Sequence, residues 1–161
     1  MQYAIQNLSP KMLVGMAMPM SLVNDQTQQL WQQFMRQKHN LPPLASEYLY
    51  SLQQYPAGYF STFSPHTLFT KWALAEVGEI NQVLPNYFTT FAFEGGDYFV
   101  VEYKGDGSDA SLFFQNLYTQ IIPEAGYAID HRPHFERLGP RYQRESKNSL
   151  EEVFIPVIRL A

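Results

Sequence analysis

Two adjacent carboxylates near the end of the chain, Glu151 and Glu152, come directly before the apolar residues Val153, Phe154 and Ile155. The stretch has the composition of a β-strand, in which successive side chains point to opposite faces of the sheet. One glutamate therefore shares its face with Phe154, and the other shares its face with Val153 and Ile155. A buried glutamate without a partner raises its pKa or acquires a counter-charge. A cationic ligand can supply that charge, so the stretch raises the question of whether one of the two glutamates is buried and what it binds.

The composition supplies the second component of such a site. Aromatic residues make up 16% of the chain, and charged residues also make up 16%, which is below the usual share of roughly 25%. We expect some of the eleven Tyr and twelve Phe to line a cleft, where Tyr offers an apolar face and a hydroxyl. Each aromatic face attracts a desolvated cation by about 0.5–2 kcal/mol. Carboxylates combined with aromatic rings predict a site for lipophilic cations that tolerates many ligands.

Several other kinds of chemistry have no support in the sequence. The chain has no Cys, which removes disulfides and thiol catalysis. Its four His residues show neither H-x-x-x-H nor H-E-x-x-H spacing, and no G-x-S-x-G or phosphate-binding glycine motif occurs. We therefore expect no metal and no cofactor. The net charge of −4 argues against direct nucleic-acid binding, which needs a basic face.

The expected elements repeat once along the chain. Strands are predicted at residues 11–18, 47–53, 69–77, 87–93, 97–104, 133–138 and 150–158. Apolar stripes predict one helix between the first two strands, with an N-cap at Asn24-Asp25, and a second helix between residues 109 and 122. The order gives two β-α-β-β halves. We predict an α+β fold in which the two pseudo-symmetric halves form a mainly antiparallel sheet, with both main helices on one face and a ligand cleft at the centre.

The whole chain, residues 1–161, is expected to form one domain. Neither a signal peptide nor a membrane span is apparent near the N-terminus, and the absence of Cys suits a cytoplasmic protein. The repeated fold uses almost the full length, which leaves no room for a DNA-binding domain.

Three ordered stretches resemble the GyrI-like small-molecule-binding family, which is also the effector-binding domain of AraC-type and MerR-type regulators. The first is Leu13-Val-Gly-Met16 followed by Leu30-Trp-Gln-Gln-Phe34. The second is Ala75-Glu-Val77, then Leu84-Pro85, then Gly96-Asp-Tyr-Phe-Val-Val-Glu-Tyr-Lys-Gly105. The third runs from Tyr118-Thr-Gln-Ile-Ile-Pro-Glu-Ala-Gly-Tyr127 through Arg132-Pro-His-Phe-Glu136 to Glu152-Val-Phe-Ile-Pro156. The resemblance extends over residues 1–158 and covers essentially the whole chain.

The resemblance implies a pocket whose glutamates lie on the last two strands. The matching positions are Glu136 and Glu152, with Leu138 and Phe154 two residues further on. Glu151 is then expected to face solvent. The alternative for Glu152 is a solvent-facing residue or an ion pair with an arginine, for which Arg137, Arg141 and Arg144 are the candidates.

Four aromatic residues complete the predicted site. Tyr48 and Tyr50 alternate with Leu49 and Ser51, and either line the cleft or pack in the core. Trp72 lies on a strand that flanks the expected pocket. Tyr118 lies on the second helix, and its hydroxyl needs a partner if it is buried. For Trp72 and Tyr118 the alternative is likewise a core position.

Three functions remain open at this point. The first is a stand-alone module that binds hydrophobic, cationic, aromatic compounds, either to sense an effector or to sequester drugs, with any effect on transcription passing through a separate protein partner. The second is a small-molecule hydrolase of the same family that uses a pocket glutamate. The third is a protein–protein modulator similar to a gyrase inhibitor. Exposed strand edges and surplus aromatics are also compatible with a homodimer.

Overall fold

The computed structural model describes residues 2–140, 142 and 147–161. Its element order begins with β1 (Ala4–Leu8), β2 (Lys11–Met20), α1 (Thr27–Gln37), a single 3₁₀ turn (Lys38–Asn40), β3 (Leu44–Gln54) and β4 (Phe69–Val77). It continues with β5 (Thr89–Phe93), β6 (Gly96–Lys104), α2 (Ala110–Asn116), a π-helical turn (Leu117–Ile121) and α3 (Ile122–Glu124). The last strands are β7 (Tyr127–Ile129), β8 (His134–Leu138) and β9 (Leu150–Arg159).

The strands form one antiparallel sheet in the order β1-β6-β9-β8-β3-β4-β2-β5, and β7 pairs with β9. Within this order, β6-β9-β8 and β3-β4-β2 are mirror-ordered halves that meet at the β8–β3 pair. Each half is a β-α-β-β unit, as predicted from the sequence. The strand before each half pairs with the other half, because β1 lies on β6 and β5 lies on β2. The predicted α+β fold is thus confirmed, and β1 and β7 are additions to it.

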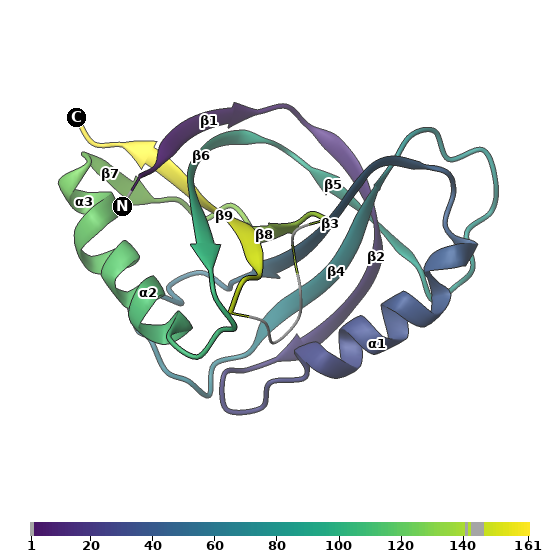
Figure 1. Cartoon of the computed structure of the whole chain (residues 1–161), viewed down its shortest axis with the longest axis horizontal. Helices are drawn as coiled ribbons and strands as arrows, with labels where there is room; N and C mark the ends of the chain where they lie inside the picture. The colour runs from purple at the N-terminus through teal and green to yellow at the C-terminus, as the bar shows by residue number, and fades with distance from the viewer. Residues whose placement is uncertain (1, 141, 143–146) are drawn as a thin grey trace.

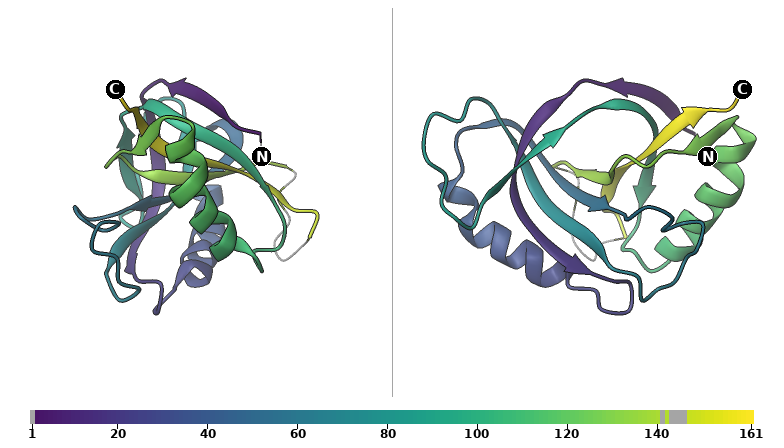
Figure 2. Two further views of the ribbon diagram at one scale, coloured as in Figure 1. Left: turned by 90° about the vertical axis from the view of Figure 1, so that its left-hand side faces the viewer. Right: turned by 180° about the vertical axis from the view of Figure 1, so that it is seen from behind.

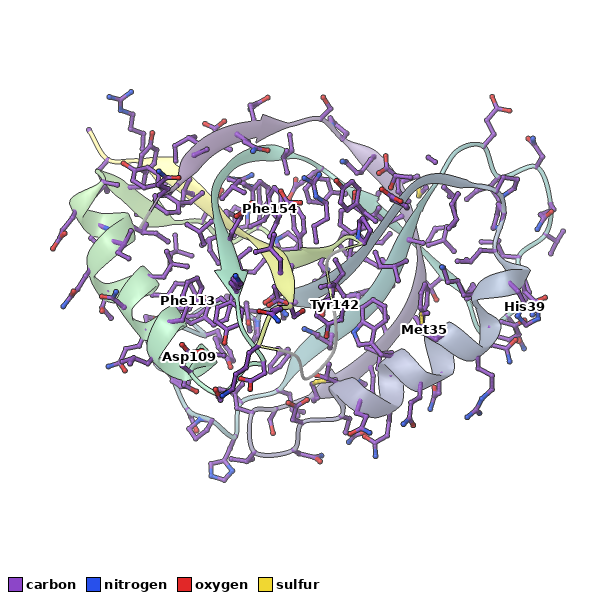
Figure 3. The ribbon with its side chains drawn as sticks, viewed as in Figure 1. Met35, His39, Asp109, Phe113, Tyr142 and Phe154 are labelled. Carbon is purple, nitrogen blue, oxygen red and sulfur yellow. The ribbon has the colours of Figure 1, made fainter. Side chains whose placement is uncertain are left out.

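The sheet is strongly curled, and both helices lie outside the curl (Figure 1; Figure 2). Leu30 and Phe34 are buried where α1 packs on β2 and β4, as the apolar stripe of that helix predicts. Leu117 and Ile122 are buried where the second helical segment packs on β6 and β9. A third cluster, rich in aromatic residues, fills the inside of the curl and includes Phe154 (Figure 3).

Local sequence explains where the helices begin and end. The N-cap position of α1 is Gln26, which forms no side-chain capping hydrogen bond, so the N-cap expected at Asn24-Asp25 is wrong. The Asp25 carboxylate nevertheless accepts a hydrogen bond of 2.9 Å from the backbone N–H of Thr27, the first residue of α1. The second helical segment passes through its π-helical turn just before Pro123, a residue that cannot donate a helical hydrogen bond. It ends at Gly126, whose φ of 91° is the left-handed conformation that often follows a helix. Within the described residues, no helix combines the length and apolar character needed to cross a membrane.

Candidate functional site

A cavity of about 820 Å³ lies between α1 and the middle of the sheet, on the helix side. Its floor comes from β3, β4, β8 and β9, so both halves of the fold contribute. The segment after β8 forms a further wall, and Figure 3 shows Tyr142 of this segment in the space between the helices. The lining residues are Asp25, Thr27, Gln28, Trp31, Gln32, Met35, Glu47, Leu49, Ser51, Lys71, Glu136, Leu138, Gly139, Pro140, Tyr142 and Glu151.

Two carboxylates, Glu136 and Glu151, lie on the cavity floor because of the register between β8 and β9. Glu136 pairs with Val153 across these antiparallel strands. Directly opposed residues share a face, and so do residues two positions apart on one strand. Glu151 therefore faces the same side as Val153 and Glu136. This places two acidic groups from neighbouring strands at one site.

The two carboxylates differ in their surroundings. The Gln53 side-chain amide donates a hydrogen bond of 3.0 Å to Glu136 Oε2. For Glu151, burial and then the nearby charge of Glu136 raise the pKa to about 7, whereas the charge of Lys71 acts in the opposite direction. Glu151 therefore holds its proton more tightly than an exposed glutamate does. A cation placed between the two carboxylates would replace that proton.

Apolar side chains surround this acidic centre. Trp31 and Met35 face the cavity from α1, while Leu49 and Leu138 belong to its floor. The Trp31 ring is held edge-on against Phe34 at a centroid distance of 5.4 Å. A ring so positioned offers a broad apolar surface to a ligand and can attract a cation through its face.

A block of aromatic rings adjoins the acidic centre on the side of the second helical segment. Its members are Tyr55, Tyr59, Phe60, Tyr118 and His134, with Phe60 5.5 Å from Tyr118 and 5.3 Å from His134 between centroids. Burial, followed by the charge of Glu136, raises the pKa of Tyr118 far above its ordinary value. Burial also lowers the pKa of His134 to about 3, so this ring is neutral.

The residues expected from sequence divide between the two faces of the sheet. Glu136 and Leu138 line the cavity. Tyr118 lies in the aromatic block rather than on the cavity wall. The remaining five lie on the opposite face of the sheet, which is the inside of its curl. They are Tyr48, Tyr50, Trp72, Glu152 and Phe154.

The sequence-based expectation that Glu151 faces solvent is wrong. Glu152 does share its face with Phe154, but this is the face that looks into the curl, and Glu151 faces the cavity instead of solvent. Glu136 and Glu152 cannot share a face, since Glu152 pairs with Arg137 in the register. Strand alternation alone separates the two glutamates but does not tell which of them joins Glu136.

Glu152 is engaged by Arg137, one of the three arginines named as alternatives. The guanidinium donates from Nε and Nη2 to the two carboxylate oxygens, at 2.9 Å each. Its central carbon also lies 4.4 Å from the Tyr48 ring centroid and 5.2 Å from that of Phe154. The expected cage of a carboxylate and aromatic rings therefore exists, and it holds a cation of the chain itself. Arg141 and Arg144 lie outside the described residues.

The other two aromatic residues of this group have internal partners as well. The Tyr50 hydroxyl donates to Glu76 at 3.0 Å, and the Trp72 indole N–H donates to Gln54 at 2.6 Å. Of the cavity lining, only Glu136 and Leu138 were expected from sequence, and the unexpected residues include four charged ones, Asp25, Glu47, Lys71 and Glu151. The signal for Lys71 is a charged residue in the middle of the apolar strand Phe69-Thr-Lys-Trp-Ala-Leu-Ala-Glu-Val77.

The comparisons with known proteins agree with this architecture. The GyrI-like small-molecule-binding domain matches residues 1–158, and the chain therefore belongs to this family. Curated protein sequences gave no match.

Three solved structures illustrate the fold. SAV2435 bound to tetraphenylphosphonium has a TM-score of 0.69 at 15% identity, covering 98% of this chain and 94% of that protein. The C-terminal domain of EcmrR has a TM-score of 0.74 at 12% identity, with coverage of 99% and 98%. A hydrolase from Listeria innocua has a TM-score of 0.62 at 12% identity, with coverage of 98% and 92%. At these identities the similarity concerns the fold.

Proposed function

We propose that this protein binds lipophilic aromatic cations in the cavity between α1 and the sheet, with Glu136 and Glu151 as the counter-charges. The observation that carries the proposal is the pair of carboxylates on the floor of a cavity that Trp31, Met35 and Leu138 also line, one of them with a pKa near 7. The charge of Lys71 offsets only part of the rise in the pKa of Glu151, and a bound cation would favour the ionised carboxylate further. Trp31 and Met35 would contact the apolar part of the ligand.

The similarity to a protein bound to tetraphenylphosphonium supports this proposal. Tetraphenylphosphonium carries a permanent charge inside four aromatic rings, which is the chemistry that an acidic, apolar cavity favours. Effector sensing and drug sequestration both require this binding step.

The test is a calorimetric titration with three compounds of similar size and different charge. These are tetraphenylphosphonium, neutral triphenylphosphine oxide and anionic tetraphenylborate. We expect tetraphenylphosphonium to bind the wild type and to lose about 1–3 kcal/mol of binding free energy in Glu136→Gln or Glu151→Gln, as for loss of one desolvated charge contact. Glu152→Gln is the matched control, because its carboxylate lies on the other face, and it should bind like the wild type. Equal binding of all three compounds, or equal affinity in all variants, would contradict the proposal.

A hydrolase is the second candidate function, and the raised pKa of Glu151 is the observation that favours it. A carboxyl group with a pKa of about 7 is suited to general acid or base catalysis near neutral pH. The similarity in fold to a hydrolase from Listeria innocua supports this candidate. Turnover of an ester or epoxide panel that is lost in Glu151→Gln would favour this function over simple binding.

A further inference from the structure

We infer that the preferred ligand of the cavity is an aromatic cation that also carries an anionic group, and that Lys71 binds this second group. The inference rests on the proposed function, because it concerns the same cavity. It identifies Lys71 as a residue that determines specificity among cations.

Lys71 is unusually buried for a lysine. Its exposure is only 7%, although it lines the cavity, and lysines are almost never fully buried unless they are paired. Within residues 2–140, 142 and 147–161, Lys71 forms no hydrogen bond or ion pair. Its ammonium group has three donors, and their remaining access is to the cavity. A buried ammonium without a hydrogen-bond partner is energetically costly, and an anionic group of a ligand would reduce that cost.

The positions of the charges form two separate subsites. In the sheet order β9-β8-β3-β4, the two proposed counter-charges Glu151 and Glu136 belong to β9 and β8, while Lys71 belongs to β4. The other acidic lining residue on the sheet, Glu47, lies on β3 six residues before Gln53, the partner of Lys71. Lys71 pairs with Gln53 on β3, and Glu136 pairs with Ser51 two residues away on the same strand. At a strand spacing of about 4.8 Å, the backbones that carry Glu136 and Lys71 are on the order of 10 Å apart. An aromatic ligand can span this distance with a cation at one end and a carboxylate at the other.

Gln53 keeps the two subsites from neutralising each other. It lies between His134 and Lys71 in the row of paired residues across β8, β3 and β4. Its side-chain amide donates to Glu136 rather than leaving that carboxylate to Lys71. Lys71 does act on Glu151 through space, since it opposes the rise in the pKa of that residue. The alternative role for Lys71 is therefore a background charge that makes all cations bind less tightly.

A matched ligand pair separates these two roles. The probes are (4-carboxybutyl)triphenylphosphonium, which is zwitterionic at neutral pH, and its methyl ester, which keeps only the positive charge. We expect the wild type to bind the carboxylate compound at least tenfold more tightly than the ester. In Lys71→Met this preference should fall at least tenfold, while Lys71→Arg should keep most of it. Lys104→Met, at an exposed position on β6, is the control and should behave like the wild type.

The outcomes distinguish this inference from the proposed function. If Lys71→Met tightens binding of both compounds by the same factor, Lys71 is only a background charge and the inference is overturned. The inference also falls if the wild type does not prefer the carboxylate, even where tetraphenylphosphonium binds and depends on Glu136 and Glu151. If no phosphonium compound binds the wild type, both proposals fail together. Thermal unfolding of each variant would show whether Lys71→Met is folded. If Lys71→Met is not folded, the comparison of Lys71→Arg with the wild type provides the second test.

Discussion

The contrast between Glu151 and Glu152 shows how neighbours determine the role of a carboxylate. The two residues are adjacent in the chain and chemically identical, yet only Glu152 has a guanidinium bound to both of its oxygens. Glu151 has Glu136 as its strongest charged neighbour, and burial acts on it in the same direction. Glu152 is therefore neutralised within the protein by Arg137, whereas Glu151 has no guanidinium partner among the described residues and is the carboxylate that we propose binds a cation.

The raised pKa of Glu151 predicts that cation binding depends on pH. The groups around it are Glu136 and Lys71, with Glu47 at the cavity lining. A bound cation favours the ionised carboxylate, so tetraphenylphosphonium must displace a proton below pH 7. We expect its affinity to increase from pH 5.5 to pH 8, by at most about tenfold per pH unit below the pKa. Titrations across this range would measure the effect, because the charge of the ligand itself does not change.

Glu151 also predicts how the stability of the protein without ligand depends on pH, and here the effect of raising the pH is unfavourable. The folded state holds the Glu151 proton more tightly than the unfolded chain, so this residue contributes stability at low pH. That contribution is lost as the pH rises from the unfolded pKa of about 4.3 through about 7. Glu151→Gln should make both the affinity for tetraphenylphosphonium and the free energy of unfolding less dependent on pH. A wild-type affinity that is constant between pH 5.5 and pH 8 would show that Glu151 is already ionised in the empty cavity.

At the scale of elements, hydrophobic periodicity was sufficient to predict most of the fold. The helix stripe through Leu30 and Phe34 and the alternation in β3 follow rules of local geometry. Two copies of the order β-α-β-β then restrict how the sheet can be arranged. The short strands β1 and β7 were not predicted, because segments of five and three residues give too few positions for a clear alternation.

The site was less predictable because it depends on the register between strands. Alternation shows that Glu151 and Glu152 face opposite sides, but only the pairing of Glu136 with Val153 determines which side holds the cavity. A shift of one residue would exchange the two. The aromatic residues are subject to the same ambiguity, since Tyr48 and Tyr50 fit a cleft or a core equally well by composition. Their partners Arg137 and Glu76 come from other strands and are not visible in the local sequence.

Helix α1 carries the aromatic wall of the cavity, which makes a prediction about fluorescence. The chain has two Trp residues, and Trp31 on α1 lines the cavity whereas Trp72 lies in the cluster inside the curl. Tetraphenylphosphonium bound on the floor would contact the first ring and not the second. We expect ligand-dependent changes in Trp emission to survive in Trp72→Phe and to disappear in Trp31→Phe. Trp31→Ala should also weaken binding by about 0.5–2 kcal/mol through the lost cation–π contact and apolar surface. A signal that persists in Trp31→Phe would place the ligand elsewhere.

At the scale of the whole molecule, the two halves are alike in topology and different in content. Both present a helix over three strands, but the side of the second helical segment is filled by the aromatic block of Tyr55, Tyr59, Phe60, Tyr118 and His134. The side of α1 remains open as the cavity. The two halves therefore share a topology, while the cavity and the block of large rings lie beside different helices.

The cavity floor joins the halves, so a ligand should stabilise the molecule as one unit. β3 and β4 belong to the first half, while β8 and β9 belong to the second. Ligand present at one hundred times its Kd adds about 2.7 kcal/mol to the free energy of unfolding. For a chain of this size, this corresponds to a rise in Tm of roughly 5–10 °C.

Scanning calorimetry with tetraphenylphosphonium would measure this stabilisation. We expect one cooperative transition that moves to higher temperature as a whole, and no shift in the double variant Glu136→Gln/Glu151→Gln. Glu152→Gln should start from a lower Tm, because it leaves Arg137 without its carboxylate, but should show the same ligand-induced shift as the wild type. If the ligand instead split the transition and raised only one part, it would be bound within a single half, and the cavity floor would not be the site.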